Sequence, residues 1–120
     1  MTLHIHTPLI ESRPLSLAAG RNIWLKLDAL QPCGSFKLRG VGYACEVHHA
    51  RGARHFVSSS GGNAGLAVAY AGRKLGVPVT VVVPETTTER AKQLLHLEDA
   101  KVVVHGLSLI HISEPTRQAE

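Results

Sequence analysis

"GGNAGLAVAYAGRKLGVPVTVVVPE", residues 61–85, is the stretch that decides the predicted fold. Small and apolar residues follow the two glycines at helical spacing. Gly76 and Pro78 end this predicted helix, because glycine accepts the left-handed conformation of a helix C-terminus and proline cannot continue a helix. The run VTVVVPE, residues 79–85, is continuously apolar, which is typical of a strand covered on both faces of a parallel sheet. The stretch therefore predicts one helix–strand unit of a parallel α/β fold.

The flanking segments continue this alternation. HFVSSS, residues 55–60, predicts a short strand before the helix. After residue 85, Thr86 and Glu89 have the spacing of a capping box and predict the start of another helix. KVVVHG, residues 101–106, predicts a further buried strand. The predicted fold class is thus α/β, a parallel sheet with flanking helices and right-handed crossovers.

Toward the N-terminus, NIWLKLDAL, residues 22–30, alternates like a strand. The helical pattern that follows predicts a helix from Ser35 to about residue 49, with Ser35 as its N-cap. Lys37 and Arg39 then fall in the first turn, where the helix dipole disfavours cations.

This placement gives Lys37 two interpretations. An unfavourable dipole and partial burial increase the neutral fraction of a lysine amine, and a neutral amine can form a Schiff base with an aldehyde. A solvated cation at an exposed helix end is the alternative. From position alone, that alternative is favoured for Arg39 and slightly favoured for Lys37.

The turn SSSGGNAG, residues 58–65, lies at the carboxyl end of a predicted strand and opens a helix. Ligands of parallel α/β sheets bind at such ends, and a helix N-terminus favours an anion. The spacing is not the G-x-G-x-x-G dinucleotide fingerprint, so it gives little support to an NAD site. The glycines alone could simply form a tight turn, but the serines and Asn63 favour a carboxylate or phosphate site.

Composition excludes several classes of protein. The chain has 120 residues, 44% hydrophobic and 18% charged, which is ordinary for one soluble globular domain. No apolar run is long enough for a membrane span, and the first residues do not resemble a signal peptide. The net charge of +4 is scattered and aromatics are 4%, so nucleic-acid binding is not expected. Cys33 and Cys45 have no metal-ligand spacing, and a reducing, cytoplasmic setting fits them. No metal site is expected, because the adjacent histidines His48 and His49 cannot face one ion on a helix.

Three segments, TPLIES (residues 7–12), WLKLDALQPCGSFKLRG (24–40) and SSSGGNAG (58–65), occur in an order and at separations that resemble one family. They are similar to the N-terminal part of the serine/threonine dehydratases that depend on pyridoxal phosphate (PLP). These are fold-type II enzymes related to the tryptophan synthase β family. The resemblance implies PLP as cofactor and a small amino acid as substrate. The full-length protein is expected to be a homodimer, and the cysteines described above favour a cytoplasmic location.

The resemblance assigns roles to particular residues. Lys37 matches the lysine that binds PLP covalently, and Phe36 would pack on the cofactor ring. Asn63 would donate a hydrogen bond to the phenolic oxygen of the ring. The substrate carboxylate would be held by the turn residues Ser60, Gly61, Asn63 and Ala64.

Departures from the family pattern bear on the activity. Cys33 stands where many members have threonine, and Asp28 where many have glutamate. Ala64 stands where threonine deaminases and serine racemases usually have histidine, so the segment resembles L-serine dehydratases more. The expected reaction is β-elimination of L-serine to pyruvate and ammonia, and of L-threonine to 2-oxobutanoate. The alternatives are a biosynthetic threonine deaminase or serine racemase, or a small-ligand-binding α/β module without enzymatic activity.

The family is considerably longer than this chain and has a second domain with a PLP-phosphate loop. Residues 1–106 are therefore expected to be the N-terminal part of a dehydratase, and the chain alone is expected to be inactive. LSLIHISEPTRQAE, residues 107–120, does not resemble the family. Its residues 107–117 can be spelled codon by codon by a transposase-type sequencing adaptor, which predicts a non-native tail. A divergent natural C-terminus is the alternative.

Overall fold

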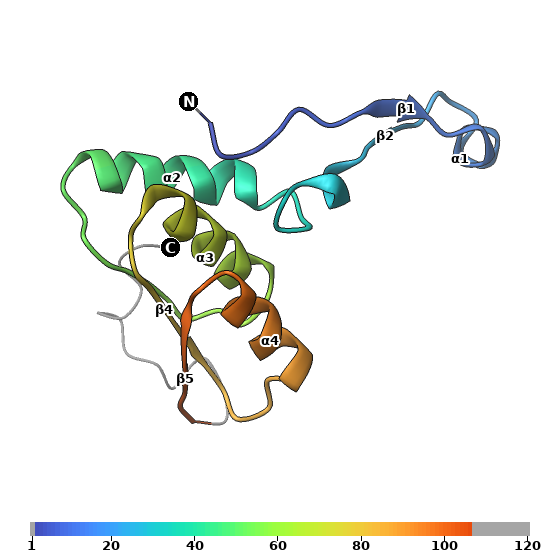
Figure 1. The fold of residues 1–120 in the computed structure, drawn as a ribbon. Coiled ribbons are helices and arrows are strands. Elements are labelled where there is room, and N and C mark those ends of the chain that lie inside the picture. Colours follow the sequence, from blue (N-terminus) through green and yellow to red (C-terminus); the bar gives the residue numbers. More distant parts are fainter. Residues whose placement is uncertain (1, 107–120) are drawn as a thin grey trace.

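The structure is a computed structural model that describes residues 2–106, so the predicted tail lies outside the described residues. Helices and strands alternate along most of the chain (Figure 1). In chain order the elements are β1 (Leu9–Glu11), α1 (Arg13–Ala19), β2 (Trp24–Lys26), the 3-10 turn η1 (Asp28–Leu30), α2 (Leu38–Ala50), β3 (Phe56–Ser58), α3 (Asn63–Leu75), β4 (Val79–Val83), α4 (Glu89–Leu97) and β5 (Lys101–Val104).

The predicted parallel sheet is confirmed. Its strand order is β3-β4-β5, and both pairings are parallel, with Val81 opposite Ser58 on one side and Val102 on the other. Helix α3 packs against β3 and β4, α4 packs against β5 and α3, and α2 packs along α3 (Figure 1). Gly76, in the left-handed conformation, ends α3 as predicted.

The core lies between this sheet and α3. Phe56, Val81 and Val83 from the strands are fully buried, together with Val68 from α3 and Leu95 from α4. Strand β4 alternates between buried and half-buried residues. It is therefore fully covered on one face only, whereas the sequence predicted burial on both. Strand β5 exposes Lys101 and Val104, so the prediction of a buried strand there is wrong.

The predicted strand at residues 22–30 is also wrong in length and in place. Only β2 is extended, and η1 follows it immediately. Strand β2 pairs with β1 in an antiparallel two-stranded sheet, with Ile10 opposite Leu25, and does not join the parallel sheet. With α1 these strands form an arm that projects from the body (Figure 1). The arm contains no buried residue in β1, α1 or β2, and leaves Leu17 and Trp24 exposed.

Both predicted N-caps are wrong. Helix α2 begins at Leu38 with Lys37 at the N-cap, because residues 32–37 form turns that leave Ser35 outside the helix. The cap of α4 is Thr88, whose hydroxyl accepts a hydrogen bond from the Ala91 N–H at 3.1 Å. No helix within residues 2–106 is long and apolar enough to cross a bilayer.

Candidate active site

Lys37 lies at the N-cap of α2, and its side chain is exposed. Within residues 2–106 its amine has neither a hydrogen-bond partner nor an ion pair. Phe36 beside it is 64% exposed, so its ring is open to solvent. Both residues line an open hollow of about 400 Å³ whose other walls come from the first turns of α2, at Arg39, Gly40, Val41 and Ala44. The amine is therefore available for chemistry beside a bare aromatic face.

Arg39 is not a solvated cation, contrary to the interpretation favoured from its position alone. Its Nε donates to Asp28 Oδ2 at 2.8 Å and its Nη2 donates to Oδ1 at 3.2 Å. The Thr7 hydroxyl donates to the same Oδ1 at 2.6 Å, and Gln31 Nε2 does so at 3.3 Å. Arg39, and then Thr7, hold the pKa of the Asp28 carboxyl well below its ordinary value, and Asp28 raises the pKa of Arg39. The carboxylate thus offsets the unfavourable position of Arg39 in the first turn.

The turn at residues 59–62 connects β3 to α3. Ser58 Oγ accepts a hydrogen bond from the Ser60 N–H at 3.3 Å, and Ser60 Oγ accepts one from the Gly62 N–H at 3.3 Å. Gly62 is the N-cap of α3, and no side chain caps this helix. Asn63 is exposed at the first helical position. The first N–H groups of α3 therefore lack a side-chain cap and can receive an anion.

Gly65 fixes the position of this turn. A Cβ atom at Gly65 would overlap the Ser60 carbonyl oxygen and lie 2.8 Å from the carbonyl carbon. It would also touch Val81 Cγ1 at 3.3 Å. Only glycine lets the Ser60 backbone lie directly on the first turn of α3.

The predicted site residues do not share one hollow. Gly61 and Asn63, together with Gly62, border a hollow of about 190 Å³ against α4, whereas Phe36 and Lys37 border the hollow on α2. Ser60 and Ala64 line neither of these two hollows. Helices α2 and α3 pack on each other, and both begin on the side from which the arm projects (Figure 1). The starts of α2 and α3, which carry Lys37 and the turn at residues 59–62, therefore lie on the same side of the molecule. The two hollows beside them are separate.

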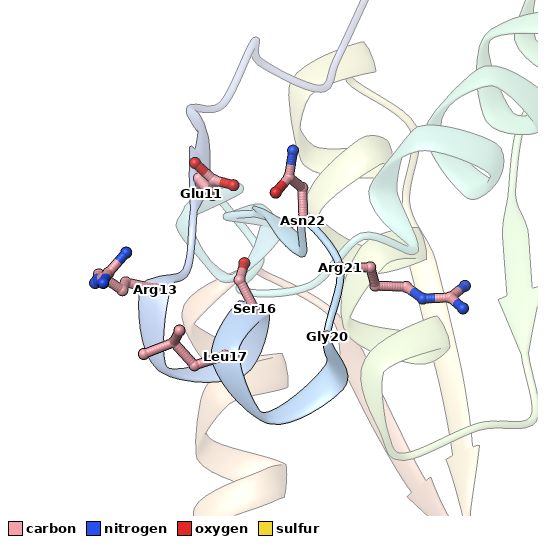
Figure 2. A pocket seen from close by; sticks show the side chains of 7 residues that line it. All are labelled: Glu11, Arg13, Ser16, Leu17, Gly20, Arg21 and Asn22. Atoms are coloured by element: carbon pink, nitrogen blue, oxygen red, sulfur yellow. The ribbon is translucent and has the colours of Figure 1, made fainter.

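A further hollow, of about 400 Å³, lies in the arm between the end of β1, α1 and the loop at residues 20–22 that follows α1 (Figure 2). Its arginines, Arg13 and Arg21, point away from it on opposite sides (Figure 2). None of the predicted site residues lines it. Residues 2–106 contain no group of three or more His, Cys, Asp or Glu side chains that could hold a metal ion.

The two cysteines are free and buried. Cys45 is fully buried in the core, and burial raises the pKa of its thiol to about 11. Burial also raises the pKa of Cys33. Neither thiol is therefore a ready nucleophile at neutral pH.

The chain belongs to the family described as "Pyridoxal-phosphate dependent enzyme", which matches residues 1–119. This confirms the resemblance found in the three sequence segments. Among curated relatives, the chain is 53% identical over 107 residues to "L-serine dehydratase/L-threonine deaminase" of Bos taurus, covering 89% of this chain and 33% of the relative. It is 52% identical over 103 residues to "Serine dehydratase-like" of Homo sapiens, covering 86% and 31%.

Solved structures support the same family. The crystal structure of a fungal L-serine ammonia-lyase from Rhizomucor miehei superposes with a TM-score of 0.84 at 33% identity, over 99% of this chain and 40% of that one. The fold is therefore that of part of a fold-type II PLP enzyme. The chain spans about a third of the length of the curated relatives it matches.

The contacts that surround Arg39 were not predicted from the sequence. Asp28 stood out there only as a departure from the family pattern, and Thr7 and Gln31 had no predicted role. One signal was present: a cation in the first turn of a helix calls for a counter-charge, and Asp28 is the acidic residue of the preceding segment. No spacing rule connects the two, because turns separate them.

Proposed function

We propose that this chain is the region of a PLP-dependent L-serine/L-threonine dehydratase that supplies the cofactor lysine and the substrate-carboxylate turn. The complete protein would convert L-serine to pyruvate and ammonia, and L-threonine to 2-oxobutanoate and ammonia. The observation that carries the proposal is the unpartnered amine of Lys37 beside the exposed ring of Phe36. The names of the relatives at about 50% identity support the substrate class.

The residues present fit PLP. An amine without a salt-bridge partner can bond to the cofactor aldehyde, and a bare aromatic ring can pack on a flat heteroaromatic ring. Lys37 would hold the cofactor covalently, and Phe36 would cover the cofactor ring. Asn63 would donate a hydrogen bond to the phenolic oxygen of that ring. When bound, PLP supplies an electron sink for the charge left on the substrate Cα.

The chain's own residues would bind the substrate and move its proton. The uncapped N-terminus of α3 would receive the carboxylate through N–H groups, with Ser60, Gly61, Asn63 and Ala64 around it. Once the substrate amine has displaced Lys37 from the cofactor, the freed amine of Lys37 would take the proton from Cα. The β-hydroxyl leaves as water, and hydrolysis of the resulting enamine returns water and releases ammonia, so that the reaction balances as L-serine to pyruvate and ammonia. Ala64, which has no titratable side chain, supports a dehydratase over a racemase or a biosynthetic threonine deaminase.

We also propose that the complete protein is a cytoplasmic homodimer. The two free, buried cysteines are compatible with a reducing compartment. Size-exclusion chromatography with light scattering on a full-length form tests the dimer.

A chimaeric enzyme tests the proposed activity. Residues 7–106 replace the matching segment of the bovine relative, which supplies the other two thirds of its length. With PLP and L-serine, the chimaera should produce pyruvate, and Lys37→Ala should reduce kcat at least about 100-fold, as loss of a catalytic base does. Lys74→Ala, at the far end of α3, is the matched control and should leave turnover unchanged. A folded, PLP-loaded chimaera whose Lys37→Ala variant keeps its turnover would refute the proposal.

A further inference from the structure

The N-terminal segment, η1 and the start of α2 are joined by one network of hydrogen bonds. Asp28 accepts from Arg39, Thr7 and Gln31, as described above. Gln31 also bonds both backbone groups of Ile5, with its Oε1 accepting from the N–H and its Nε2 donating to the carbonyl, each at 2.9 Å. Lys26 Nζ donates to the Thr7 carbonyl oxygen at 2.6 Å. Segments that are far apart in sequence therefore converge on the carboxylate of Asp28.

The start of α2 needs this support. Lys37 at its N-cap makes no side-chain capping bond, and the first turn has no acidic residue. The Ser35 hydroxyl accepts a hydrogen bond from the Lys37 N–H at 3.4 Å, which is long for a hydrogen bond. Asp28 supplies the missing negative charge from outside the helix, with a fork of two bonds to Arg39 that fixes direction as well as distance. The Asp28 side chain is 12% exposed and the Arg39 side chain is 37% exposed, so this ion pair is partly open to solvent.

We infer that Asp28, held by Thr7 and Gln31, is a positioning residue for Lys37. Asp28 accepts two hydrogen bonds from Arg39, which lies two residues after Lys37 in the first turn of α2. These bonds fix the start of α2 and the direction in which the Lys37 side chain leaves the backbone. This inference rests on the proposed function, because it gives Lys37 its cofactor-binding role. Thr7 and Asp28 then act on the reaction without touching the cofactor.

The test uses the 120-residue chain and two readouts. PLP followed by borohydride fixes the cofactor on lysines, and peptide mass mapping gives the share on Lys37 against Lys26, Lys74, Lys92 and Lys101. Hydrogen exchange reports the amides of residues 39–41 without any cofactor. The variants are Asp28→Asn, Asp28→Glu and the near-isosteric Thr7→Val, which keeps the inference testable if Asp28→Asn does not fold. Glu98→Gln is the matched control, because it breaks the Arg73–Glu98 pair, which has similar side-chain exposure and lies elsewhere.

Asp28→Asn should lower the Lys37 share and speed exchange at residues 39–41 by about two- to fivefold, the range expected for a partly exposed ion pair. Asp28→Glu should restore both, Thr7→Val should change both in the same direction, and Glu98→Gln should change neither. Unchanged exchange at residues 39–41 in Asp28→Asn and Thr7→Val overturns the inference, whether or not PLP binds. An unchanged Lys37 share in these variants also overturns it. A wild-type chain in which PLP shows no preference for Lys37 contradicts the proposed function instead. The exchange rates at residues 39–41 then still test whether Asp28 fixes the first turn of α2.

Discussion

Replacing Gly65 by alanine should displace the turn that is proposed to hold the substrate carboxylate. The added methyl group would overlap the Ser60 carbonyl oxygen, which is backbone and cannot rotate away. Either the turn moves off α3 or the start of α3 shifts, and Val81 on the other side of the methyl group limits the second route. We therefore expect Gly65→Ala to lower both the stability of the chain and its affinity for a carboxylate ligand.

The magnitude follows from two opposing terms. Alanine within a helix is favoured over glycine by about 1 kcal/mol. Overpacking of a well-filled site costs about 1–3 kcal/mol, and an obstacle made of backbone belongs at the upper end. The net loss for Gly65→Ala is about 1–2 kcal/mol. Gly40→Ala is the matched control, because a Cβ atom at Gly40 in α2 meets no atom within 4 Å. That substitution should gain about 0.5–1 kcal/mol.

Urea unfolding of the 120-residue chain, followed by far-ultraviolet circular dichroism, measures the difference. The free energies of unfolding of the two variants should differ by about 1.5–3 kcal/mol, which is about 0.8–1.5 M in midpoint for a slope of about 2 kcal/mol per M. Gly40→Ala should unfold above the wild type and Gly65→Ala below it. A midpoint for Gly65→Ala at or above that of Gly40→Ala would show that the Ser60 backbone does not lie on α3.

Three further predictions concern the fold and its charges. Thr88→Ala should destabilise the chain by about 1 kcal/mol in urea unfolding, because the Ala91 N–H loses its cap, and Thr88→Ser should restore most of this. Arg39 lowers the pKa of Asp28 below its ordinary value of 3.8. The contribution of this ion pair to the free energy of unfolding is therefore present above about pH 4 and is lost as the pH falls through the lower, folded-state pKa of Asp28. Asp28→Asn should therefore flatten the acid limb of a stability-against-pH curve, and an unchanged acid limb would contradict the pairing. Cys45, with a pKa of about 11, should resist alkylation by iodoacetamide at pH 8 until urea unfolds the chain, and rapid labelling of the folded chain would contradict its burial.

The parallel sheet could be predicted from the sequence because its signal is local. The continuous apolar runs of β4 and β5, separated by one helical pattern, leave little choice of topology. The membership of β2 could not be predicted in this way. An alternating strand has the same pattern in an antiparallel pair as in a larger sheet, and its pairing with β1 depends on contacts that no spacing rule shows.

The predicted starts of α2 and α4 were wrong for a related reason. Residues 86–88 are three consecutive threonines, and each is an acceptable N-cap. The choice of Thr88 follows from the preceding turn, in which the Thr87 N–H donates to the Pro84 carbonyl at 3.1 Å. In the same way, the turns before α2 exclude Ser35 from the helix and leave Lys37 at its cap.

The candidate site residues could be named from the sequence, but the hydrogen bonds that join Asp28 to Arg39 and Thr7 could not. Lys37, Phe36 and the turn at residues 60–64 stand in recognisable motifs, and their roles stay predictions. The contact between Asp28 and Arg39 spans an irregular segment of turns, so neither helical nor strand periodicity could show it. Burial of Thr7 against the same carboxylate depends likewise on tertiary structure.

Peptide mapping of the wild-type chain after PLP and borohydride tests the central claim most directly. The chain has five lysines, and four of them serve as internal references for accessibility. We expect the reduced cofactor mainly on the peptide that contains Lys37, and a carboxylate ligand at the start of α3 should not redirect it to another lysine. Cofactor spread evenly over the five lysines, or concentrated on Lys26, Lys74, Lys92 or Lys101, would show that Lys37 is not the cofactor lysine.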